Sequence, residues 1–388
     1  QPMSRPRRQE GSALRGFSVS FRHLSRLTDD TGVLEHALGR IPRRGEGYTT
    51  DDNARALWAC VEAIDAFEGR VRPDDARPLQ LADRYLAFLA WAQRPDGTFH
   101  NNFRYDRTPE PETPSDDCFA RALWACAVAG VRLPDEDKAF AAADVVRRAL
   151  PRVQELVHPR GWAYALAACC LLLEDGWLRG ARSPWRNRED ELYELVKRLE
   201  ERLISRFREY SGPGWAWFDP VMTYGNGVLP WALFAAYRVT GSRGALETAR
   251  TSLDFLIMKM TAPQGWIRPI GNRGWCTRES RAMWDQQPLE AMKLALACSA
   301  AYDVLERAYY RQVAEKCLDW FYGDNELQTP LADPDEGSCC DGLTPDGPNR
   351  NQGAESTIAY LLTELIVRKM SAGSLNRPRE SEAFGRLR

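Results

Sequence analysis

Six helical segments that are apolar nearly all round constrain the fold of this chain more than any other feature. They begin near Asp52, Asp117, Arg160, Gly225, Gln286 and Gln352, at intervals of 43 to 66 residues. Six amphipathic segments with a charged face alternate with them. A helix that is apolar all round is buried on every side, whereas an amphipathic helix faces solvent. We therefore expect an all-α fold, the α/α toroid of six helical hairpins, with the apolar helices as its inner ring.

An open α-solenoid is the alternative architecture for a chain of helical hairpins. Closure is favoured because the first and last hairpins keep the pattern of the others. An internal repeat also indicates equivalent hairpins: GYTTDDNARALWAC at 47–60 returns as TPSDDCFARALWAC at 113–126, and Asp51 aligns with Asp116. Both copies place two aspartates directly before an alanine-rich apolar helix.

Composition limits the class of protein. The toroid is expected over residues 17–371, with flexible segments at 1–16 and 372–388 that lack apolar periodicity. A formal net charge of −2 argues against nucleic acid or a membrane surface as a partner. No apolar run approaches the ~18 residues that span a bilayer, and no signal-peptide pattern opens the chain.

The cysteines indicate a reduced environment. Most of the ten cysteines lie within apolar helical segments, where a free thiol behaves as a small hydrophobe. A cytoplasmic location is therefore expected. Cys276, Cys339 and Cys340 lack the spacing of a zinc site, so we expect no metal and no cofactor.

The connections that lead into the inner helices are the candidate site. The segments 94–116, 211–224, 262–285 and 325–351 are long and rich in aromatic residues, whereas the connections in the other direction are short. Long loops in a compact domain are usually functional. Since these loops all precede inner helices, we expect the site on the rim formed by the N-terminal ends of the inner ring.

Carboxylates open most of the inner helices. An acid at a helix N-terminus caps free backbone N–H groups, but where two acids are adjacent, one can cap while the other faces the cavity. Several carboxylates around one pocket with aromatic faces suit glycoside hydrolysis, which needs a general acid and a base or nucleophile. The catalytic candidates are Asp52, Asp117, Asp285 and Glu355, with Asp117 preferred as the acid and Glu355 as the base.

Several motifs resemble a known family. The stretches GYTTDDNARAL (47–57), GTFHNNFRYDR (97–107), DDCFARALWA (116–125), DQQPLEAM (285–292) and NQGAESTIAYLL (351–362) look like the helical-toroid domain found fused behind bacterial glycosyltransferases or standing beside them. The fold of that domain is similar to the six-hairpin glycosidase superfamily. The resemblance runs from about Phe17 to Ile366 and implies a carbohydrate-active toroid with a separate glycosyltransferase as a partner.

The predicted substrate-binding residues come from two sources. The resemblance implies Tyr48, Asp51, Asn53, Arg55, Asn102, Tyr105, Arg121, Tyr224, Asn226, Gln286, Gln287, Asp341 and Gln352. Location on the same rim adds His100, Asp116, Trp215, Asp219, Trp266, Arg268, Trp275 and Trp284, the tryptophans as stacking surfaces for sugar rings. The rim arginines either orient the carboxylates through ion pairs or bind an anionic ligand such as a uronic acid or a phosphate.

The leading interpretation is an inverting glycoside hydrolase that acts on an oligosaccharide or glycoconjugate. A sugar epimerase or polysaccharide lyase is an alternative, although such enzymes usually depend on His or Tyr as base and this chain has only four His. A terpene cyclase is a further alternative, but the D-x-D-D and D-D-x-x-D motifs are absent around Asp51 and Asp52. A non-catalytic glycan-binding module that serves a glycosyltransferase is the third.

Overall fold

The structure is a computed structural model that describes residues 19–66, 77–174 and 187–376. Six long helices form its inner ring: α2 (Thr50–Ala66), α4 (Asp116–Arg132), α6 (Pro159–Glu174), α8 (Val228–Thr240), α10 (Pro288–Leu305) and α12 (Ala354–Asn376). The outer helices are α1 (Arg22–Leu27), α3 (Arg77–Ala92), α5 (Glu136–Ala149), α7 (Glu189–Tyr210), α9 (Arg243–Lys259) and α11 (Ala308–Phe321). The sequence prediction of an all-α fold with alternating helices is confirmed.

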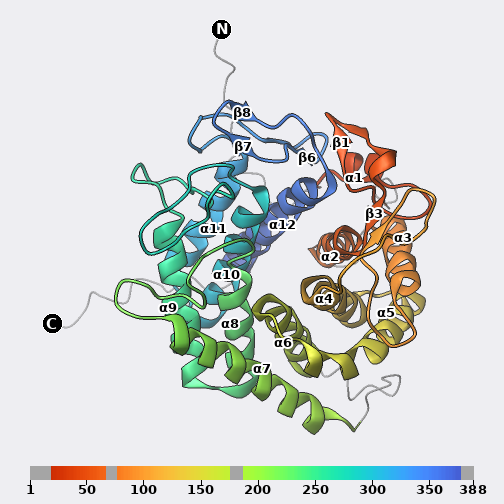
Figure 1. Cartoon of the computed structure of the whole chain (residues 1–388), viewed down its shortest axis with the longest axis horizontal. Helices are drawn as coiled ribbons and strands as arrows, with labels where there is room; N and C mark the ends of the chain where they lie inside the picture. The colour runs from red at the N-terminus through yellow and green to blue at the C-terminus, as the bar shows by residue number, and fades with distance from the viewer. Residues whose placement is uncertain (1–18, 67–76, 175–186, 377–388) are drawn as a thin grey trace, which may run out of the picture.

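The inner ring is closed. Each inner helix packs against the next, and α12 returns to α2, so that the six helices enclose one axis (Figure 1). At the end of the ring away from the helix N-termini, Lys369 of α12 forms ion pairs with Glu62 and Asp65 of α2, and Arg132 of α4 reaches Glu62 at 2.9 Å. These contacts exclude the open solenoid.

The outer helices cover the ring with one apolar face each. In α7, Leu192, Val196, Leu199 and Leu203 are buried at intervals of three to four residues, and most of the charged residues between them face solvent, although Glu200 is buried. The first outer helix, α1, is short: it spans six residues and packs against α12.

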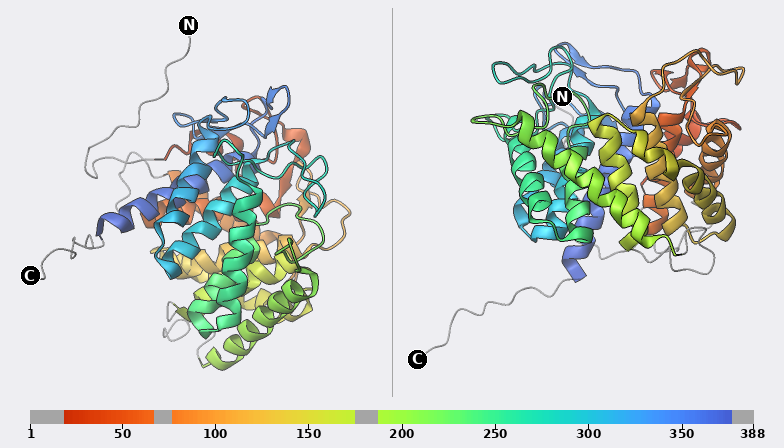
Figure 2. Two further views of the ribbon diagram at one scale, coloured as in Figure 1. Left: turned by 90° about the vertical axis from the view of Figure 1, so that its left-hand side faces the viewer. Right: turned by 60° about the horizontal axis from the view of Figure 1, so that its bottom comes forward.

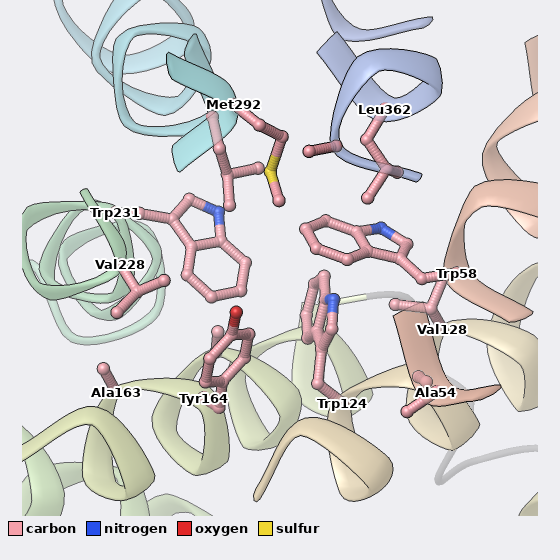
Figure 3. Packing of buried hydrophobic residues seen from close by; sticks show 14 of the residues in the cluster. Ala54, Trp58, Trp124, Val128, Ala163, Tyr164, Val228, Trp231, Met292 and Leu362 are labelled. Carbon is pink, nitrogen blue, oxygen red and sulfur yellow. The ribbon is translucent and has the colours of Figure 1, made fainter. Parts of the chain in front are cut away.

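Aromatic side chains fill the lumen of the ring. Trp58, Trp124 and Trp231 come from three inner helices, and their rings lie 4.8 to 6.3 Å apart between centroids (Figure 3). Tyr164 packs edge-on against Trp231 at 5.7 Å, and Met292 closes the group. Since these side chains are buried, the axis is a packed core and not a channel. A ligand site must lie above this core.

Long loops and short hairpins gather on the rim at the N-terminal ends of the inner helices (Figure 2). The strands pair as β1 (Ala37–Leu38) with β2 (Ile41–Pro42), β3 (Tyr48–Thr49) with β4 (Asn102–Phe103), β5 (Ala332–Asp333) with β6 (Ser338–Cys339), and β7 (Leu343–Thr344) with β8 (Gly347–Pro348). Short 3₁₀ helices lie at Arg44–Glu46 and Leu150–Glu155. The turn at Gly97 requires glycine, because its φ is +91° and a Cβ would lie 2.1 Å from the carbonyl oxygen of Arg148.

The predicted end of the toroid needs a correction. Helix α12 continues to Asn376, five residues into the segment that the sequence assigned to a flexible tail. The predicted leader at 1–16 and the rest of the tail lie outside the described residues. Within the described part, no helix is both long and apolar enough to cross a bilayer, and no three His, Cys, Asp or Glu side chains cluster as metal ligands would.

Candidate functional site

A cavity of about 570 Å³ opens on the rim above α4, α6 and α8, and we call it the main cavity. The first turns of α4 and α6 and the loop before α8 form its walls. Among its lining residues are Asp116, Asp117, Arg160, Asp219 and Tyr224. Four of these were predicted as site residues, so the ring does bring together acids that are distant in the sequence.

Asp117 is the carboxylate of the main cavity whose hydrogen-bond partner is a phenol. It lies in the first turn of α4, is half-buried, and accepts a hydrogen bond on Oδ2 from the hydroxyl of Tyr224 at 2.7 Å. The guanidinium of Arg160 covers the Tyr224 ring at 4.4 Å and donates to the Tyr224 carbonyl oxygen at 2.6 Å. Burial raises the pKa of Tyr224 to about 12, and the neighbouring Asp117 adds to the rise. The phenol therefore remains a donor to Asp117 at any physiological pH.

Two other acids of the main cavity, Asp116 and Asp219, bind neighbouring parts of the cavity wall. Asp116 accepts hydrogen bonds from the backbone N–H groups of Val157 at 2.7 Å and His158 at 2.9 Å, which fixes the chain entering α6. Asp219 is paired with Arg206, whose Nε donates at 3.0 Å. The geometry therefore gives both residues an anchoring role on the cavity wall.

Asp51 and Arg121 form a buried ion pair between α2 and α4. Asn101, from the loop before α4, accepts a hydrogen bond from the backbone N–H of Asp51 at 3.1 Å. Burial opposes ionisation, but Arg121 and Arg55 outweigh it and hold the pKa of Asp51 below its ordinary value. The two copies of the sequence repeat therefore contact each other: Asp51 of the first copy and Arg121 of the second join the neighbouring inner helices α2 and α4.

Asp52, Arg55 and Glu355 form the second group at the rim. Arg55 contacts Asp52 at 3.0 Å through one terminal nitrogen and Glu355 of α12 at 3.1 Å through the other. The Asp52 side chain is 5% exposed, whereas that of Glu355 is 43% exposed. Burial raises the pKa of Asp52 to about 7; Arg55 opposes this rise and Glu355 adds to it. Asp52 is therefore partly protonated at neutral pH, beside an accessible carboxylate.

Lys293 and Tyr164 form a buried polar pair at the centre of the ring that the sequence analysis did not identify. The Lys293 ammonium donates a hydrogen bond to the Tyr164 hydroxyl and lies over the Trp58 ring at 5.3 Å. Burial lowers the pKa of Lys293 to about 8. Burial alone would raise the pKa of Tyr164, but Lys293 and Arg121 outweigh it, so this pKa lies below its ordinary value. A single lysine within the apolar segment of α10 was the available signal.

A second cavity of about 310 Å³, the outer cavity, lies beside α2 on the same rim. Its lining includes Tyr48 and Tyr105, both predicted as site residues, together with Asp29, Asp30, Asp106 and Arg107. The main and outer cavities share no lining residue. The rim therefore carries two separate hollows within the described residues.

The predicted aromatic surfaces divide into buried and accessible rings. Trp215 is 1% exposed and packs edge-on against Phe255, so it offers no face to a ligand, which corrects the sequence prediction. Trp275 is half-buried and lies 6.4 Å from Tyr224, near the main cavity. Trp284 is also half-buried and packs against the core.

Trp266 and Arg268 lie in a group of their own. Trp266 Nε1 donates to Glu326 at 3.0 Å, and Arg268 pairs with the same carboxylate, with one contact at 3.0 Å. The two residues fix the loop after α9 to the loop after α11. They line neither the main nor the outer cavity.

Three predicted residues are buried within the rim. Asn53 accepts from the backbone N–H of Val33 at 3.0 Å, and Asn226 donates to Glu290 at 2.9 Å. Gln286 accepts from Trp320 Nε1 at 3.0 Å and is fully buried. Their amides are enclosed by the protein itself, so the prediction that Asn53, Asn226 and Gln286 bind the substrate is wrong.

The remaining predicted residues anchor loops or helix ends. Asp341 accepts from the Gly353 N–H at 2.8 Å and the Ser356 hydroxyl at 2.6 Å at the start of α12, and Asp285 pairs with Arg273 at 2.9 Å. Three further predicted residues bind other side chains of the rim: His100 contacts Arg94 at 2.8 Å, Asn102 donates to Glu112 at 3.1 Å, and Gln352 accepts from Arg40 at 3.3 Å. The last, Gln287, is the residue directly before α10.

Comparison with known proteins identifies the class of fold. No protein-family model matches the chain, and no curated protein matches it. Among solved structures, it is similar to the cellobiose 2-epimerase of Bacillus thermoamylovorans B4167, with a TM-score of 0.70, 11% identity, and coverage of 91% of this chain and 96% of that one. A D-mannose isomerase gives a TM-score of 0.66 and 10% identity, over 90% of this chain and 94% of that one.

A third similar structure is an α-1,6-mannanase of family GH76 from Salegentibacter sp. HEL1_6. Its TM-score is 0.59 at 10% identity, over 90% of this chain and 96% of that one. That structure is an inactive variant, with two consecutive aspartates changed to asparagine, in complex with α-1,6-mannotriose. The chain therefore has the α/α toroid fold that these carbohydrate-active enzymes share.

Proposed function

We propose that this chain is an inverting glycoside hydrolase that acts on an oligosaccharide at the rim of the toroid. The observation that carries the proposal is the contrast among the rim carboxylates. Asp51 and Asp52 are held in buried ion pairs, whereas Asp117 and Glu355 each have one defined partner and remain accessible. Two accessible carboxylates on one rim are the minimum for acid and base catalysis.

Asp117 is assigned as the general acid. Tyr224 occupies its Oδ2, so Oδ1 is the oxygen left to carry a proton toward the main cavity. A protonated carboxyl group can accept through one oxygen while it donates through the other. The hydroxyl of Tyr224 would thus fix which oxygen faces the glycosidic bond.

Glu355 is assigned as the general base. Arg55 contacts the Glu355 carboxylate at 3.1 Å and fixes its position on the rim, and Asp52 contacts Arg55 from the other side at 3.0 Å. Asp117 and Glu355 lie on α4 and α12, the two helices that flank α2 in the ring. Inversion requires ~6.5–9.5 Å between the two carboxyl groups, whereas retention requires about 5 Å, so the distance between Asp117 and Glu355 in a ligand complex decides between the two mechanisms.

The fold neighbours support this class of activity. The inactive mannanase variant lacks two consecutive aspartates, and two of this chain's consecutive aspartate pairs, Asp51-Asp52 and Asp116-Asp117, lie in the first turn of an inner helix. Of the second pair, Asp116 anchors the backbone and Asp117 faces the cavity. A neutral oligosaccharide is the proposed substrate, because the cations of the ring centre already have carboxylate or phenol partners.

A sugar epimerase is the second candidate, and one observation favours it. The pKa of Tyr164 is lowered by the cations Lys293 and Arg121, which outweigh burial, and a phenol of that kind could serve as a base for proton abstraction. Tyr164 is nevertheless 1% exposed, and none of the four His side chains, all within the described residues, forms a hydrogen bond or ion pair with Asp52, Arg55 or Glu355. The hydrolase therefore remains the first choice.

The test is product analysis by proton NMR in D₂O, with cellotriose and α-1,6-mannotriose as substrates. Hydrolysis yields new anomeric signals in the inverted configuration, whereas epimerisation incorporates deuterium at C2 of an uncleaved sugar. We expect Asp117→Asn and Glu355→Gln each to lower kcat by about 100-fold or more, with binding retained.

The matched control is Glu279→Gln, an exposed acid on the same rim, which should leave kcat unchanged. Deuterium at C2 without cleavage would replace the hydrolase with the epimerase. Unchanged chemistry with altered sugar affinity in both variants would indicate a glycan-binding module that serves a separate glycosyltransferase.

A further inference from the structure

The outer cavity has the features of a second ligand site. It is formed by the turn at Asp29 and Asp30, strand β3 at Tyr48, and the loop that carries Tyr105, Asp106 and Arg107. The chemistry proposed for the main cavity uses none of these residues. The outer cavity therefore needs its own explanation.

Two tyrosines build its apolar wall. The rings of Tyr48 and Tyr105 are nearly parallel, at 22° and 6.3 Å between centroids, and Tyr105 is 46% exposed while Tyr48 is 2% exposed. Tyr48 is held in place because its hydroxyl donates to Asp29, whose other oxygen accepts from the Thr31 N–H at 2.8 Å. The buried ring thus supports an exposed one. An exposed, supported aromatic face is a low-entropy contact surface.

Polar groups stand around this face. Asp106 accepts from Thr108 at 2.6 and 3.0 Å, in both cases through Oδ1, so its Oδ2 is directed elsewhere. Asp30 and Arg107 lie 3.5 Å apart, and their side chains are 83% and 59% exposed. These groups offer acceptors and donors beside an apolar surface, as a sugar ring with one apolar face and a rim of hydroxyl groups requires.

The charges of the outer cavity exclude an anion. Asp29, Asp30 and Asp106 carry three negative charges against the single positive charge of Arg107. A uronic acid or a phosphate would be repelled, whereas hydroxyl groups donate readily to carboxylates. We propose that the outer cavity binds one neutral pyranose residue, stacked on Tyr105 and hydrogen-bonded by Asp30, Asp106 and Arg107. The site does not depend on whether the main cavity hydrolyses sugars.

The experiment is calorimetric titration of cellotriose and α-1,6-mannotriose into the full chain. The background variant is Tyr224→Ala, which alters the wall of the main cavity, so that a further change caused by substitution at Tyr105 reports the outer cavity. Adding Tyr105→Ala should weaken this binding by about 2- to 10-fold, the value of one aromatic contact. Tyr105→Phe should retain it, because the ring and not the hydroxyl carries the contact.

The control is Tyr309→Ala, a 49% exposed tyrosine on α11 that lines neither cavity, which should leave binding unchanged. Equal affinity in the Tyr105→Ala protein, no binding of either sugar, or binding of Ca²⁺ that competes with the sugar would each overturn the proposal. Loss of hydrolysis with sugar binding intact would count against the proposed function alone, since calorimetry measures no turnover.

Discussion

The buried carboxyl of Asp52 gives the sharpest quantitative prediction. In the native state its pKa is about 7, against an ordinary value of 3.8, because burial disfavours the ionised form. The folded protein therefore holds this proton over a pH range in which the unfolded chain has released it. A raised native pKa of this kind contributes stability that is complete below pH 3.8 and is lost as pH rises to about 7.

The size of the effect follows from the same two values. At about 1.36 kcal/mol per pKa unit, the difference between 3.8 and about 7 amounts to about 4 kcal/mol in the free energy of unfolding. The substitution Asp52→Asn imitates the protonated group at every pH. Relative to the variant, the native protein should thus lose about 4 kcal/mol between pH 4 and pH 8.

Urea unfolding of both proteins at pH 4, 5, 6, 7 and 8, followed by circular dichroism, measures this difference. Asp137→Asn is the control, because Asp137 is an exposed acid in the first turn of α5 and its carboxyl group is not buried in the folded protein. If the difference in unfolding free energy between the native protein and Asp52→Asn does not change with pH, the assignment of Asp52 as a partly protonated neighbour of Glu355 is refuted.

Three further predictions address the core, the closure and the cavity. Trp231→Ala should lower the free energy of unfolding by about 3–5 kcal/mol in urea titrations, because it empties the centre of the lumen; a loss below 1 kcal/mol would mean that the lumen is not packed. Glu62→Gln should lower the free energy of unfolding by about 2–3 kcal/mol in the same measurement, because it leaves Lys369 without its buried partner. The double variant Glu62→Gln/Lys369→Met should regain part of this stability. Tyr224→Phe should lower kcat by about 10–100-fold with little change in KM, because Asp117 loses the hydrogen bond that fixes which of its oxygens faces the glycosidic bond; an unchanged kcat would remove Tyr224 from the mechanism.

The ring could be predicted because its cause is local. The alternation of amphipathic and apolar helices is a property of short windows of sequence, and each inner helix begins within three residues of its expected start, as at Thr50 against Asp52 and Val228 against Gly225. Closure followed because the last helix kept the pattern. The C-terminal end of α12 was predicted too early, because the last residues up to Asn376 lack the apolar periodicity that indicates a helix.

The details of the site depend on contacts between distant residues, which periodicity does not encode. The hydrogen bond from Tyr224 to Asp117 spans 107 residues, and the contact of Arg55 with Glu355 joins the first and last inner helices. Sequence also gives no sign that Trp215 is buried, because an aromatic residue in a loop can turn inward or outward. Lys293 did leave a sign, since a charge within a fully apolar helix must find a partner inside the ring.

The most direct test of the central claim is a crystal structure of the Asp117→Asn protein soaked with the oligosaccharide that the native protein cleaves. We expect a glycosidic oxygen within hydrogen-bond distance of position 117, and a water molecule held by Glu355 against the opposite face of the sugar. An oligosaccharide bound with its glycosidic bond remote from both residues would contradict the account.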